Sequence, residues 1–141
     1  MPDVPVWVVP GDQRMKRSTT ILLIEDDPSV GPATLEVLAA EGHAAVLATS
    51  FDEAFEILLA PHRIQVLLLD LQLGLRRGDE LIESLRARGA TIPPIVIFSA
   101  RPIDELVHAA KMMGAEAFLQ KPCSGIRLAE AIELATAQRP T

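Results

Sequence analysis

Five residues at the ends of short apolar runs carry groups that could bind a metal ion and a phosphoryl group. They are Glu25, Asp26, Asp70, Ser99 and Lys121. Three carboxylates repel one another unless a cation lies between them, and Mg²⁺ is the divalent cation that best fits such oxygen ligands. An aspartate beside Mg²⁺ can attack a phosphoryl group and form an acyl phosphate, while an ammonium group neutralises the charge being transferred. We therefore expect a phosphate and metal site.

The apolar runs before these residues are typical of buried strands in a parallel sheet. We expect strands at about 20–25, 44–48, 65–70, 94–99 and 116–119, and helices at about 29–41, 52–60, 79–88, 103–113 and 125–137. Five strand–helix units in succession predict an α/β fold, an open and doubly wound parallel sheet with helices on both faces. Ligands of such sheets bind outside the carboxyl ends of the strands, so the five residues should meet at one edge.

The composition narrows the class of protein. A chain of 141 residues, 49% of them hydrophobic, suffices for one domain with a buried sheet. A formal net charge of −6 argues against nucleic acid or an anionic membrane as a direct partner. The single cysteine, Cys123, excludes an internal disulfide and a cysteine-based zinc site. The three histidines show no metal-ligand spacing, and we expect all of them on the surface: His43, His62 and His108.

We expect residues 1–18 to form a tail outside the fold, 19–137 to form the domain, and 138–141 to form a short C-terminal tail. The apolar segment Val4–Pro10 is short, is interrupted by proline and lacks a preceding basic region, which argues against a signal peptide. No apolar run approaches the length of a membrane span. We therefore expect the protein to lie in the cytoplasm, which also fits its single cysteine.

Small and polar residues mark the expected helix ends. Gly42, Gly89 and Gly114 come just after helical patterns and predict left-handed C-caps. Asp52 and Asp104 stand where N-caps belong, because an aspartate there accepts hydrogen bonds from free N–H groups of the first turn.

Taken together, the site residues resemble those of a response-regulator receiver domain, over about residues 19–137. They stand in the family's order, with 44 residues from Asp26 to Asp70, 29 more to Ser99 and 22 more to Lys121. Any one of these residues would be a weak signal, whereas all of them in register make a specific one. The resemblance implies a flavodoxin-like sheet of five strands in the order 2-1-3-4-5.

The resemblance also implies a role for each residue. Asp70 matches the phosphoacceptor, Asp26 the direct metal ligand, and Glu25 the ligand that acts through water. Asp70 would also be a ligand of Mg²⁺, as would the backbone carbonyl of Gln72, and Lys121 would pair with the phosphoryl group.

A conformational switch is implied as well. Ser99 matches the hydroxyl that moves to the phosphoryl group, and Phe118 matches the aromatic ring that then turns inward. Taken alone, Phe118 is more typical of plain core than of a switch. The Lys121–Pro122 peptide bond is cis in relatives, an uncommon isomer for X–Pro bonds in general.

The loop after Asp70 departs in part from the family's pattern. Gly78 stands at the family's loop glycine, but Gly74 replaces a proline that is often found four residues after the acceptor. Arg76 and Arg77 make this loop unusually basic. None of these differences removes a chemical group from the predicted site.

The implied function is that of a stand-alone receiver, a signalling domain that catalyses only its own phosphorylation and dephosphorylation. It would take a phosphoryl group from a phosphohistidine on a histidine kinase or histidine phosphotransfer protein, then change its contacts with a downstream protein. Only about twenty residues follow Lys121, so we expect no output domain there. The chain would be a monomer or a phosphorylation-dependent dimer.

Two alternatives remain beside this reading. A degenerate receiver would act as an interaction module without phosphorylation. A small Mg²⁺-dependent phosphohydrolase of the haloacid-dehalogenase class shares the residue types, but there the nucleophile comes first, within Asp-x-Asp. Here the acidic pair comes first, and Asp70-Leu71-Gln72 lacks the second carboxylate needed as a general acid.

Overall fold

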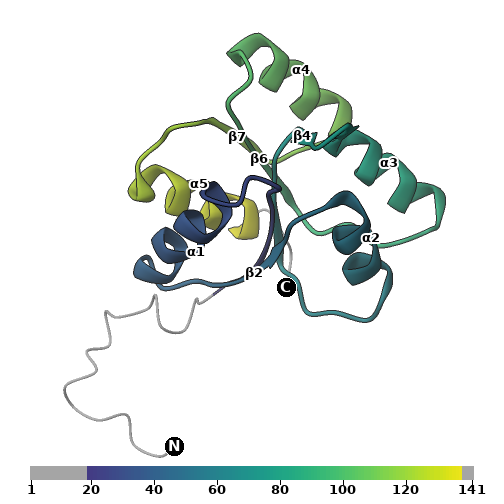
Figure 1. Cartoon of the computed structure of the whole chain (residues 1–141), viewed down its shortest axis with the longest axis horizontal. Coiled ribbons are helices and arrows are strands. Elements are labelled where there is room, and N and C mark those ends of the chain that lie inside the picture. Colours follow the sequence, from purple (N-terminus) through teal and green to yellow (C-terminus); the bar gives the residue numbers. More distant parts are fainter. Residues whose placement is uncertain (1–18, 138–141) are drawn as a thin grey trace, which may run out of the picture.

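The computed structural model describes residues 19–137, which form a parallel sheet covered by helices on both faces (Figure 1). In their order across the sheet, the strands are β2 (Ala44–Ala48), β1 (Thr20–Ile24), β3 (Val66–Leu69), β6 (Ile95–Ser99) and β7 (Ala117–Gln120). All neighbouring pairs are parallel. The predicted doubly wound α/β fold and the order 2-1-3-4-5 of its parallel strands are therefore confirmed. The tails expected at 1–18 and 138–141 lie outside the described residues.

The helices divide between the two faces of the sheet (Figure 1). They are α1 (Val30–Ala40), α2 (Phe51–Leu59), α3 (Gly78–Ala87), α4 (Ile103–Met113) and α5 (Gly125–Ala137). Side chains alternate along each strand, so Leu22 and Leu67 pack with α2, α3 and α4, whereas Ile21 and Leu68 pack with α1 and α5. None of the helices within residues 19–137 has the length and apolar character that a membrane span requires.

The helix ends match the glycine predictions but not the aspartate ones. The predicted C-cap glycines all have positive φ, at 88° for Gly42, 75° for Gly89 and 72° for Gly114. Asp52 is not an N-cap, because burial of Phe51 starts α2 one residue earlier and the Ser50 hydroxyl accepts the N–H of Glu53 instead. Asp104 likewise lies inside the first turn of α4, which Pro102 precedes.

One histidine was wrongly expected on the surface. His43 is buried between the end of α1 and the start of β2, and its Nδ1 accepts the N–H of Thr19 over 3.3 Å. The backbone N–H of His43 also donates to the carbonyl of Leu38 over 3.0 Å. His108 is exposed as predicted, and His62 is half-buried.

A short hairpin after β3 is absent from the sequence-based prediction. Its strands are β4 (Gln72–Leu73) and β5 (Arg76–Arg77), paired antiparallel. Gly74 opens the two-residue turn with a φ of 64°, a backbone conformation that residues other than glycine rarely adopt. Strands of two residues are too short to give an alternating pattern, which is why the sequence did not reveal them.

Candidate functional site

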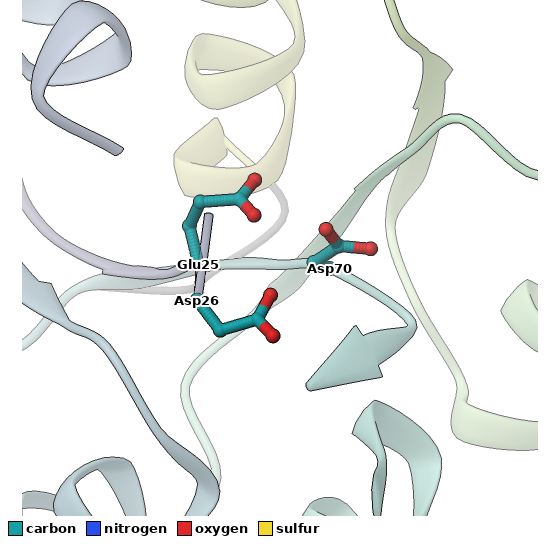
Figure 2. Close-up of side chains that lie close together, drawn as sticks. All are labelled: Glu25, Asp26 and Asp70. Atoms are coloured by element: carbon teal, nitrogen blue, oxygen red, sulfur yellow. The ribbon is translucent and has the colours of Figure 1, made fainter. Parts of the chain in front are cut away.

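The carboxyl ends of β1 and β3 bring three carboxylates together (Figure 2). Glu25 and Asp26 directly follow β1, and Asp70 directly follows β3. β1 and β3 are neighbours in the sheet. The N–H of Asp70 donates to the carbonyl of Ile24 over 3.2 Å and holds the two strand ends side by side. One oxygen of each carboxylate lies within 4.8 Å of the other two. The structure thus brings three predicted site residues to the expected edge of the sheet.

Lys121 reaches the same cluster from the segment after β7. Its Nζ donates to Asp70 Oδ2 over 3.0 Å and also to Glu25 Oε1. The Glu25 side chain is 2% exposed and the Lys121 side chain 15% exposed, so water screens these ion pairs only weakly. The peptide bond between Lys121 and Pro122 is cis, as the resemblance implies.

Burial and charge shift the pKa values of this cluster. Burial raises the pKa of Glu25 above its ordinary value, the hydrogen bond from Lys121 opposes this, and the charge of Asp70 adds to it. Burial alone would lower the pKa of Lys121, but its bond to Glu25 and the charge of Asp70 outweigh burial and raise it. Lys121 therefore stays a cation at neutral pH. Ionisation of Glu25, in contrast, lowers the stability of the folded state.

The raised pKa of Glu25 predicts how stability depends on pH. Between the ordinary value of 4.5 and the higher folded value, the folded state keeps a proton that the unfolded state has released. The contribution of Glu25 to stability is thus fully present below 4.5 and is lost as pH rises through the folded pKa. Urea unfolding without Mg²⁺ should show this loss in the wild type and not in Glu25→Gln. Identical pH profiles for the two proteins would contradict the assignment.

The donor set fits a hard divalent cation. Three carboxylates face one ammonium group, so the cluster keeps an excess of negative charge that Lys121 alone does not balance. Asp26 is exposed, whereas Glu25 is buried, so an ion could enter from the Asp26 side. Carboxylate oxygens are the ligands that Mg²⁺ prefers.

The β4–β5 hairpin contacts the two aspartates through its backbone. The N–H of Gln72 donates to Asp70 Oδ1 over 3.2 Å, and the N–H of Gly74 donates to Asp26 Oδ2 over 2.7 Å. Sequence reasoning assigned Gln72 a ligand role through its carbonyl, which stays a prediction. It missed the contact of Gly74 with Asp26, although a glycine where the family often has proline was a visible signal.

The two predicted switch residues lie on the neighbouring strands. Ser99 is buried at the end of β6, and its hydroxyl accepts the N–H of Arg101 over 3.2 Å. Among residues 19–137 no hydrogen bond joins this hydroxyl to a carboxylate of the cluster. Phe118 is half-buried on β7 and packs against the core on the α2, α3 and α4 face. Their roles as a switch stay predictions.

Several curated proteins are similar to this chain in sequence. The transcriptional regulatory protein MalR of Bacillus subtilis is 35% identical over 104 residues, covering 72% of this chain and 43% of MalR. PdtaR of Mycobacterium tuberculosis, also a transcriptional regulatory protein, is 32% identical over 119 residues, covering 84% of this chain and 57% of PdtaR. The chain spans about half the length of the curated relatives it matches.

Two solved receiver domains show the same fold. The response regulator receiver protein of Burkholderia phymatum is 26% identical with a TM-score of 0.74, covering 85% of this chain and 96% of that one. A CheY-like receiver domain protein of Methanospirillum hungatei is 22% identical with a TM-score of 0.74, covering 86% and 95%. The family model of the response regulator receiver domain matches residues 21–133. This chain therefore belongs to the response regulator receiver domain family of two-component signalling.

Proposed function

We propose that Asp70 accepts a phosphoryl group from a phosphohistidine on a histidine kinase or a histidine phosphotransfer protein. The observation that supports this most directly is the contact of Lys121 Nζ with Asp70 Oδ2 over 3.0 Å at the carboxyl edge of the sheet. An ammonium group there lies beside the carboxylate that would attack, where it can offset charge on an incoming phosphoryl group.

In the proposed reaction an oxygen of Asp70 attacks phosphorus and forms an acyl phosphate. The bond between phosphorus and the imidazole nitrogen of the donor breaks, and its electron pair stays on that nitrogen, which takes up a proton. Lys121 stabilises the negative charge on the transferring group. Glu25, Asp26, Asp70 and the backbone carbonyl of Gln72 would hold Mg²⁺, which when bound supplies further positive charge at the site.

The phosphorylated state would act through protein contacts. A phosphoryl group on Asp70 adds negative charge and acceptor oxygens beside Lys121. The Ser99 hydroxyl would then leave the N–H of Arg101 for a phosphoryl oxygen, and Phe118 would turn inward on β7. The stand-alone status of the receiver stays a prediction beside curated relatives of about twice its length.

Intact-mass spectrometry after incubation with acetyl phosphate tests the proposal. We expect one phosphoryl adduct in the wild type with Mg²⁺, and none without Mg²⁺ or in Asp70→Asn. Asp104→Asn is the matched control, because Asp104 is an exposed aspartate at the start of α4 and should leave the adduct unchanged. A folded wild-type protein that binds Mg²⁺ but forms no adduct would overturn the proposal and favour the interaction module.

A further inference from the structure

The β4–β5 hairpin holds both aspartates of the acceptor site through backbone N–H groups. Gln72 donates to Asp70 and Gly74 donates to Asp26, and the Gln72 side chain donates back to the carbonyl of Gly74 over 2.6 Å. The position of the Asp26 carboxylate therefore depends on the position of the Gly74 turn.

The hairpin is too small to hold its own shape. Its ladder has two residue pairs, Gln72 with Arg77 and Leu73 with Arg76, and isolated two-stranded hairpins are marginally stable in water. Leu73 is buried in the core and anchors β4. Leu75, at the turn, is fully exposed and anchors nothing. β5 runs directly into α3, where the Gly78 N–H donates to the carbonyl of Leu71. A side-chain anchor between β5 and an element other than α3 must come from its two arginines.

The two arginines differ in what they contact. The Arg76 guanidinium lies 3.6 Å from the centroid of the Phe51 ring, and its Nη1 is 3.8 Å from Asp52 Oδ1. Phe51 is buried at the start of α2, so Arg76 ties β5 to a separate, rigid element. Arg77 instead pairs with Asp79, which lies only two residues further along the chain, in the first turn of α3.

We propose that Arg76 is a positioning residue for the metal ligand Asp26: by stacking on Phe51 it holds the hairpin so that the Gly74 N–H fixes the Asp26 carboxylate. This inference rests on the proposed role of Asp26 as a ligand of Mg²⁺. It assigns a task to a basic loop that the phosphoryl chemistry leaves without one. The guanidinium acts through its planar contact with the ring, and its charge alone does not supply that contact.

The test compares Arg76→Gln with Arg77→Gln, which remove the same charge from adjacent positions. Without Mg²⁺, NMR hydrogen exchange of the Gly74 amide should be about threefold to fivefold faster in Arg76→Gln than in Arg77→Gln, the factor expected for an exposed cation–π contact. The Kd for Mg²⁺, from calorimetric titration of the metal alone, should rise by a similar factor in Arg76→Gln only. Circular dichroism should show that both variants are folded.

A double-mutant cycle with Phe51→Leu keeps the proposal testable if charge effects intervene. Phe51→Leu removes the ring and leaves Arg76 in place, so it should speed exchange at Gly74, and adding Arg76→Gln should then change little. Equal values for Arg76→Gln and Arg77→Gln, or faster exchange with an unchanged Kd, would overturn the proposal. Because exchange is measured without Mg²⁺ or a phosphoryl donor, a failure of the proposed function would show separately.

Discussion

Replacing Lys121 with methionine should slow phosphorylation by acetyl phosphate by about 100-fold to 1,000-fold, the loss typical of removing one preorganised donor from a transition state. Lys121 is the cation that hydrogen-bonds both Asp70 and Glu25, and it is largely shielded from water. Methionine keeps much of the chain's apolar length but carries no charge. The rate is measured by intact-mass spectrometry at saturating Mg²⁺.

The affinity of the same variant for Mg²⁺ separates the loss of charge neutralisation from the loss of the metal site. Without the ammonium group the carboxylates carry more uncompensated charge, so Mg²⁺ should bind Lys121→Met at least as tightly as it binds the wild type. Lys111→Met, on the exposed side of α4, is the matched control and should phosphorylate normally. A wild-type rate in Lys121→Met would exclude the assigned role, since no other described ammonium group bonds Asp70.

Gly78→Ala should destabilise the protein by about 2 kcal/mol or more, as expected when overpacking meets atoms that cannot move aside. A Cβ at Gly78 would lie 2.3 Å from the backbone oxygen of Asp70 and 3.2 Å from Leu69 Cδ1. The Gly78 N–H also donates to the carbonyl of Leu71 over 2.8 Å, which holds the start of α3 against the residue that follows Asp70. Relief of the clash must shift Asp70, and phosphorylation should slow as well. Urea unfolding followed by circular dichroism gives the free energy.

Gly31→Ala is the control for Gly78→Ala. Its Cβ would come close to the two methyl groups of Leu47, at 3.1 and 3.2 Å, and this flexible side chain can give way. The next atom, Glu25 Cγ at 3.8 Å, is at ordinary van der Waals distance. We expect a change within about 1 kcal/mol, because alanine is also the better helix former. Equal effects at the two glycines would show that close approach to the Asp70 carbonyl does not require glycine at 78.

Much of the fold was predictable because local patterns and tertiary structure agree. The apolar runs that became β1, β3 and β6 are buried on both faces, so nearly every residue in them had to be apolar. Each run also ends in a chemically active residue, and parallel strands place their carboxyl ends at one edge. These two facts were enough to predict the meeting of Glu25, Asp26 and Asp70.

Other features needed the tertiary structure because they depend on partners distant in the chain. Three contacts join segments about 24 to 48 residues apart in the chain. They are the hydrogen bond from Thr19 to buried His43, the hydrogen bond from Gly74 to Asp26, and the stacking of Arg76 on Phe51. The start of α2 was misplaced because burial of Phe51 outweighed the capping preference of Asp52. The sequence by itself determined the five strands of the parallel sheet and the meeting of Glu25, Asp26 and Asp70 at its carboxyl edge. Only packing decided how a two-residue hairpin, without a periodic pattern of its own, is held over that site, because its position is fixed by contacts with other elements.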